Sequence, residues 1–146
     1  MSINAHSRRL LILTLVVILC IALDQATKVI ARATLATAEP LIFAGGLARL
    51  AYAENPGAFL SLGADLPPDL RFWIFAVLAT VLLVALAVYA LRASAQTPLL
   101  TLVAVSLFVA GGVGNLIDRL VNDGRVIDFM VVGVGWLRTG VFNVAD

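Results

Sequence analysis

Three long apolar segments constrain this chain more than any other feature of its sequence. Phe72–Leu91 runs for 20 residues without a charge, and Leu99–Ile117 runs for 19. About 20 apolar residues in a helix cross the hydrocarbon core of a bilayer. The chain is 62% hydrophobic and 13% charged, whereas soluble domains are about half apolar and about a quarter charged. These segments therefore predict an integral membrane protein with helical spans.

The first apolar segment is shorter and needs polar neighbours to complete a span. Leu10–Leu23 is an uncharged run of 14 residues. As a helix it would rise only about 21 Å, less than the roughly 30 Å of a hydrocarbon core. We therefore expect the helix to continue through Asp24 and Lys28 toward Ala31, with Asp24 at or below the far interface.

A secretory signal peptide is the alternative interpretation of this start, because Arg8 and Arg9 precede a short apolar run. The run ends in Ala22-Leu23-Asp24, which lacks small residues at both positions that a cleavage site requires. Leu19 before Cys20 also differs from a lipoprotein signal, where a small residue is expected. The sequence thus favours an uncleaved helix.

Charged residues predict which side of the membrane each loop faces. With a cytoplasmic N-terminus, three of the ten Lys and Arg residues lie inside and seven outside, so a plain count does not follow the positive-inside rule. However, Arg8 and Arg9 flank the first span, which often dominates orientation, and all nine Asp and Glu residues fall on the opposite side. We predict a cytoplasmic N-terminus, spans at about 10–31, 72–91 and 99–119, and extracytoplasmic segments at 32–71 and 120–146.

The outer segments contain short apolar pieces bounded by turn residues. Gly45-Gly46 separates Leu41–Phe43 from Leu47–Ala53, and Val126–Val132 and Gly135–Leu137 follow the third span. Pieces of this length between clusters of Gly, Pro and Asn are typical of strands. The predicted fold class is an α-helical membrane protein with three transmembrane helices and a small extracytoplasmic β-sheet.

Composition argues against several kinds of site. No basic run indicates nucleic-acid binding, and the net charge is only +1. Cys20 is the only cysteine and His6 the only histidine, so we expect no internal disulfide, no metal site and no cofactor. A Ser–His catalytic pair is not expected either, because His6 precedes the first span.

Ionisable groups at membrane depth are costly and therefore mark functional candidates. Asp24 and Lys28 are four residues apart on one helix. Gly111 and Asn115 share a face just before Asp118-Arg119, and glycines let another helix approach while polar side chains bond across the contact. The alternative for each set is structural: an internal ion pair in the first span, and a packing seam with an interfacial Asp–Arg pair in the third.

Two further acids lie among apolar neighbours. Asp128 stands within Val126–Phe129, and Asp146 ends Phe142–Asp146. A poorly solvated carboxyl group has a raised pKa, and two facing carboxyls can share one proton, as in aspartic proteases. The charged member then takes a proton from water while the neutral member donates to the scissile carbonyl. The alternative is a pair of solvated loop acids.

Taken in order, five segments of this chain resemble the motifs of lipoprotein signal peptidase (signal peptidase II). Each motif alone is weak, but five in order with the matching hydropathy are specific. The segments are Asp24–Lys28 (DQATK), Glu54–Phe59 (ENPGAF), Gly111–Arg119 (GGVGNLIDR), Val126–Phe129 (VIDF) and Phe142–Asp146 (FNVAD).

The resemblance implies a single membrane peptidase domain, 1–146, in the bacterial cytoplasmic membrane, with four helices and an extracytoplasmic sheet that cradles the substrate. Its substrates would be prolipoproteins that carry diacylglycerol on a cysteine, cut just before that cysteine. We also predict a monomer in contact with membrane lipid. The implied catalytic pair is Asp128 and Asp146. The residues implied to hold the pair and the substrate, or to shape the site, are Asp24, Lys28, Asn55, Gly57, Asn115, Asp118, Arg119 and Asn143.

Two features depart from the family pattern. Asn55-Pro56-Gly57-Ala58-Phe59 differs from the commoner form of that loop. The chain also ends at Asp146, where family members continue into a fourth spanning helix, so we expect a chain that lacks this span.

Three other functions fit parts of the sequence. A small transporter would use Asp24, Asp118 and Asp128 as a proton relay, although such acids would be strung through the membrane and these gather at one side. A non-enzymatic membrane subunit would use the glycine-rich third span to pack against a partner. A serine–lysine peptidase would use Lys28 as the base for Ser61.

Overall fold

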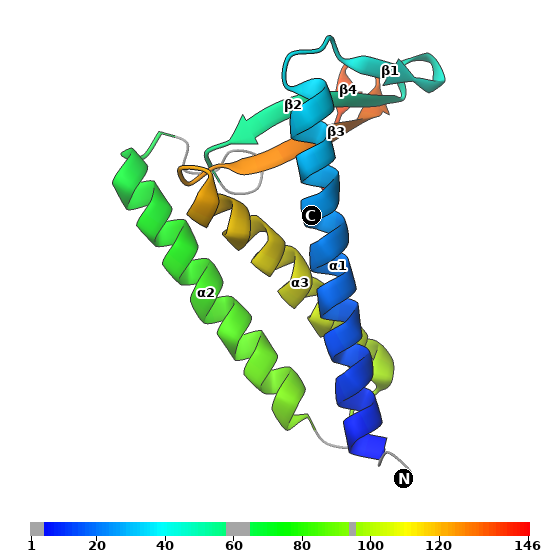
Figure 1. Ribbon diagram of the computed structural model, residues 1–146, viewed down its shortest axis with the longest axis vertical. Helices are drawn as coiled ribbons and strands as arrows, with labels where there is room; N and C mark the ends of the chain where they lie inside the picture. Colours follow the sequence, from blue (N-terminus) through cyan, green and yellow to red (C-terminus); the bar gives the residue numbers. More distant parts are fainter. Residues whose placement is uncertain (1–4, 58–64, 94–95) are drawn as a thin grey trace.

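Three long helices dominate the structure, a computed structural model that describes residues 5–57, 65–93 and 96–146 (Figure 1). They are α1 (Ala5–Leu35), α2 (Pro68–Arg92) and α3 (Leu99–Val121). Each contains a stretch long and apolar enough to cross a membrane, at Ser7–Leu35, Asp69–Arg92 and Leu99–Val121. The prediction of three such helices is confirmed, and each predicted span lies within one of them.

The helices keep most of their apolar surface on the outside. Leu19 of α1, Leu78 of α2 and Phe108 of α3 are all exposed. Exposing such apolar surface is unfavourable in water but favourable in lipid. A helix also satisfies its own backbone hydrogen bonds there. The three helices are therefore built to be surrounded by lipid.

Glycines on α3 allow both other helices to pack closely against it, and α3 lies between them (Figure 1). A methyl group added at Gly112 would overlap the side chain of Leu83 on α2. One added at Gly114 would overlap the carboxylate of Asp24 on α1. The small residues thus act as contact points for two different neighbours, as is common between membrane helices.

A four-stranded antiparallel sheet, in the order β1-β2-β3-β4, lies across the end of α1 (Figure 1). Its core contact joins Ala31 and Leu35 of α1 to Phe129. The predicted short strands are confirmed, and the two central strands run further than their apolar pieces indicated. The predicted bounds of the last strand, Gly135–Leu137, were wrong, because Gly135 and Trp136 form the turn before it. The strands are β1 (Leu41–Phe43), β2 (Ala48–Asn55), β3 (Val126–Val134) and β4 (Leu137–Arg138).

Two tight turns place the central strands. Gly45 and Gly46, both with positive φ, turn the chain between β1 and β2. Asp123 and Gly124, also with positive φ, turn it from α3 into β3, a conformation that Gly and Asp tolerate best. Only four residues thus separate the end of α3 at Val121 from the start of β3, which brings the polar end of α3 beside the sheet.

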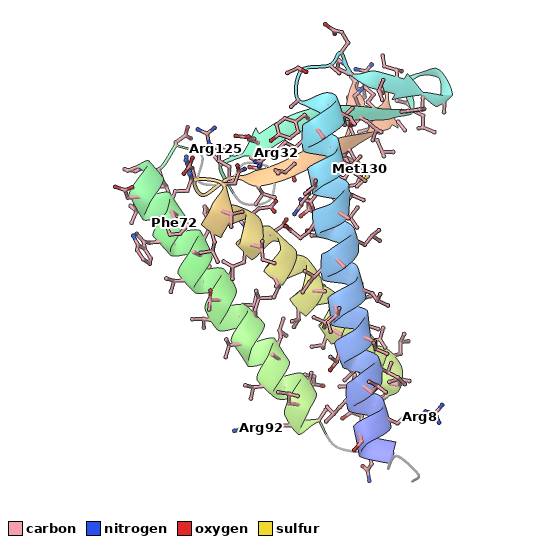
Figure 2. The ribbon with its side chains drawn as sticks, in the orientation of Figure 1. Arg8, Arg32, Phe72, Arg92, Arg125 and Met130 are labelled. Carbon is pink, nitrogen blue, oxygen red and sulfur yellow. The ribbon has the colours of Figure 1, made fainter. Side chains whose placement is uncertain are left out.

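Arginines mark the two ends of the helices. Figure 2 shows Arg8 and Arg92 at the end that carries the N-terminus, and Arg32 and Arg125 at the end that carries the sheet. Glu54 of β2 accepts a hydrogen bond from Arg125 at 3.2 Å and one from Tyr52 at 2.9 Å. The side-chain hydrogen bond from Tyr52 is the main cause that lowers the pKa of Glu54. The sheet end therefore carries a partly exposed set of ion pairs around Glu54.

Candidate active site

Asp128 lies on β3 and is 2% exposed. Its Oδ1 accepts a hydrogen bond from Nδ2 of Asn143 at 2.7 Å, and its Oδ2 accepts one from Nδ2 of Asn55 at 3.1 Å. Asn55 ends β2, which pairs with β3 so that Ala53 stands opposite Asp128. The sheet register and the C-terminal segment thus hold both carboxyl oxygens.

Asp146 is exposed and is held from two directions. Its Oδ1 accepts a hydrogen bond from Nδ2 of Asn115 at 2.9 Å, and its Oδ2 accepts one from the backbone N–H of Asn143 at 3.1 Å. The side-chain oxygen of Asn143 also accepts the N–H of Ala145 at 2.7 Å, which closes a local turn. Asn143 therefore contacts both acids, Asp128 with its side chain and Asp146 with its backbone.

The surroundings of Asp128 favour its protonated form. Burial is the main cause that raises the pKa of Asp128, and the negative charge of Asp146 raises it further. The hydrogen bonds from Asn55 and Asn143 oppose this shift, as does the charge of Lys28, but the net direction is upward. A buried acid with a raised pKa thus lies beside an exposed one.

Behind these acids lies a buried cluster around Lys28, which is 1% exposed. Its Nζ lies 2.9 Å from Oδ2 of Asp24, 3.0 Å from Oδ2 of Asp118 and 2.9 Å from Oδ1 of Asn115. Oδ2 of Asp118 also accepts the backbone N–H of Ile127 at 3.0 Å. The cluster therefore joins α1, α3 and the strand that carries Asp128.

Arg119 connects α3 to the loop that follows β2. Its Nη2 donates to the backbone oxygen of Gly57 at 3.0 Å, and its Nη1 donates to the backbone oxygen of Asn115 at 3.2 Å. The N–H of Gly57 donates to the side-chain oxygen of Asn55 at 3.0 Å. The loop is thus hydrogen-bonded both to α3 and to Asn55, which in turn donates to Asp128. Ser61, proposed as a partner of Lys28, lies outside the described residues.

A cavity of about 570 Å³ opens over the two acids, a size typical of ligand-binding pockets. No group of three or more His, Cys, Asp or Glu residues that could hold a metal ion lies within the described ranges. The residues that line the cavity are Asn55, Asn115, Arg119, Val126, Asp128, Arg138, Thr139, Gly140, Val141, Phe142 and Asp146.

All ten residues singled out in the sequence lie in this one region. Five of them line the cavity, and the others support it from behind or from the adjoining loop. Sequence reasoning missed Gln25, whose Nε2 lies 3.0 Å from Asp118 Oδ1 and 3.1 Å from Gly114 O. It also missed Arg138 and Phe142 on the cavity wall. The polar residues Asp24–Lys28 in the first span could have indicated Gln25. Nothing in the sequence indicated which residues line the cavity.

Comparisons with known proteins agree on one family. The family model described as signal peptidase (SPase) II matches residues 16–146. The lipoprotein signal peptidase of Desulforapulum autotrophicum is 37% identical over 142 residues, which make up 97% of this chain and 86% of that protein. The lipoprotein signal peptidase of Streptococcus pyogenes serotype M3 is 36% identical over 139 residues, 95% of this chain and 84% of that protein.

A solved structure shares the fold. It is a bacterial membrane enzyme determined by the in meso method at 1.9 Å resolution. It matches with a TM-score of 0.77 and 28% sequence identity over 91% of this chain and 81% of that chain. With the family match over most of its length, the chain belongs to the signal peptidase II family.

Proposed function

We propose that this membrane peptidase is an aspartic endopeptidase that removes the signal peptide from diacylglyceryl-modified prolipoproteins. The observation that carries the proposal is the single asparagine, Asn143, that contacts both Asp128 and Asp146 at the edge of an open cavity. The family match and relatives named lipoprotein signal peptidase support the substrate class.

The environments of the two acids suit them to different roles in proton transfer. Asp128, buried and with a raised pKa, holds the proton, and exposed Asp146 is the carboxylate. Asp146 takes a proton from water as the water oxygen attacks the scissile carbonyl carbon, while Asp128 gives its proton to the carbonyl oxygen. Asp146 then gives its proton to the leaving nitrogen as the C–N bond breaks, and Asp128 takes back a proton from a hydroxyl of the tetrahedral intermediate. The pair thereby returns to its starting charge.

The arrangement suits a substrate that is anchored in lipid. The cavity lies at the end of α3, one of the helices fit to cross a membrane, and beside the sheet. A diacylglyceryl group on the substrate cysteine would hold the preceding peptide bond near the membrane surface. We therefore place the cut just before that cysteine.

We further propose a single domain, 1–146, in the bacterial inner membrane with its N-terminus in the cytoplasm. The spans would lie at about 10–31, 72–91 and 99–119. The segments 32–71 and 120–146, which carry all the acidic residues except Asp24 and Asp118, would lie on the extracytoplasmic side. In this arrangement the active site faces outward, where water and exported substrates are available.

Cleavage of a diacylglyceryl-modified prolipoprotein, followed as a gel shift in lipid, tests the proposal. We expect cleavage by the parent chain and none by Asp128→Asn or Asp146→Asn. Asp123→Asn is the matched control, because Asp123 is an exposed acid on the turn after α3 and lies outside the cavity. Full activity of Asp128→Asn would falsify the assigned pair.

A further inference from the structure

Lys28 lies outside the cavity, yet a single side chain connects it to Asp146. An ammonium group has three N–H donors. Oδ2 of Asp24, Oδ2 of Asp118 and Oδ1 of Asn115, all within 3.0 Å, accept these three hydrogen bonds. Two of the acceptors carry negative charge and would suffice for an ion pair. The third, Asn115, is neutral and points to the candidate active site.

Asn115 is the link because its two ends have different partners. Its Oδ1 accepts from Lys28 at 2.9 Å and from Nδ2 of Asn143 at 3.1 Å, while its Nδ2 donates to Oδ1 of Asp146 at 2.9 Å. If the amide were flipped, its N–H groups would face the donors of Lys28 and Asn143. Its oxygen would then face the carboxylate of Asp146. The two donors therefore fix which end of the amide reaches Asp146.

We propose that Lys28 is a positioning residue for the peptidase reaction, which orients the amide of Asn115 so that its N–H holds the Asp146 carboxylate. This inference rests on the proposed function and deepens it.

The surroundings of Lys28 hold it in this role. It is almost fully buried, and Asp24 and Asp118 accept its other two N–H groups. Asp118 is itself tied to the backbone of Ile127, next to Asp128. Arg32, one turn further along α1, points elsewhere, because it donates to Tyr52 and Asn122. Lys28 is thus the cation of α1 that reaches Asn115.

A kinetic cycle tests whether Lys28 acts through Asn115. We expect Lys28→Met to lower kcat on the order of 10- to 100-fold, with KM nearly unchanged because Lys28 does not line the cavity. Asn115→Ala should also lower kcat, and Lys28→Met added to Asn115→Ala should cause no further loss. Losses that multiply would show that Lys28 acts independently of Asn115 and would overturn the proposal.

A second measurement does not depend on Lys28→Met folding or on a substrate. Lys28 is the only lysine in the chain, so ¹⁵N-lysine labelling gives one Nζ resonance by NMR. We expect Asn115→Ala and Asp146→Asn to shift this resonance and Asp123→Asn to leave it in place. If the chemical shift of Lys28 Nζ is the same in Asp146→Asn as in the parent chain, the proposed connection is overturned. Absence of cleavage by the parent chain, with both shifts present, would instead count against the proposed function alone.

Discussion

The side-chain amide of Asn143 donates a 2.7 Å hydrogen bond to Oδ1 of Asp128, and both residues are almost fully buried. The backbone N–H of Asn143 donates to Oδ2 of Asp146 at 3.1 Å, so one residue contacts both acids. Four predictions concern this arrangement and the packing behind it.

Asn143→Ala should lower kcat on the order of 100-fold, because it removes the hydrogen bond to Oδ1 of Asp128 and disturbs the turn that presents Asp146. The measurement is steady-state cleavage of the lipidated prolipoprotein. Asn122→Ala is the control, since Asn122 at the end of α3 donates to Arg125 rather than to either acid. An unchanged kcat for Asn143→Ala would show that Asn143 does not position the pair.

Asn55→Ala should move the alkaline limb of the activity profile to higher pH. The hydrogen bond from Asn55 lowers the pKa of Asp128, whose net shift is upward. Removing that bond raises the pKa of Asp128 further, so Asp128 keeps its proton to higher pH. The protonated form that the proposed mechanism needs is therefore present over a wider pH range. The measurement is kcat/KM against pH. A limb that stays in place, or moves to lower pH, would contradict Asp128 as the proton donor.

Gly114→Ala should destabilise the protein by about 1–3 kcal/mol, because the new methyl group would overlap the buried Asp24 carboxylate. Gly112→Ala is the matched control: it makes the same change in the same helix but meets the end of the Leu83 side chain, which can rotate. Thermal unfolding in detergent compares the two. Equal unfolding midpoints would argue that the contact between Gly114 and Asp24 is not tight.

Gly111→Ala should reduce kcat on the order of 10- to 100-fold while stability changes less than in Gly114→Ala. A methyl group at Gly111 would overlap the backbone oxygen of Ala145, the residue before Asp146. The substitution therefore displaces the Ala145–Asp146 segment rather than the cluster around Lys28. Cleavage rates and unfolding midpoints are measured on the same preparations. Normal cleavage by Gly111→Ala would show that the Ala145–Asp146 segment can move without loss of activity.

Local features of the sequence were sufficient to predict the helices and strands. Apolar runs of bilayer length predicted two of the helices, and a shorter run continued through polar residues predicted the first, since solvation by lipid depends on length and composition. Glycine pairs and short apolar pieces predicted the strands, because turn chemistry is local. The motifs from Asp24 to Asp146 also identified the family before any contact between them was known.

The contacts between those motifs were decided only by tertiary structure. Lys28 and Asn115 are 87 positions apart, and Asn143 and Asp128 are 15 apart. The resemblance assigned these residues to one site, but no spacing or periodicity gave the individual contacts. Nothing in the sequence indicated that Arg138 and Phe142 line the cavity, although Phe142 begins the last motif. Residue type and spacing determine solvation and local conformation, whereas which polar groups meet depends on how closely α3 packs against α1 and on the register of β3.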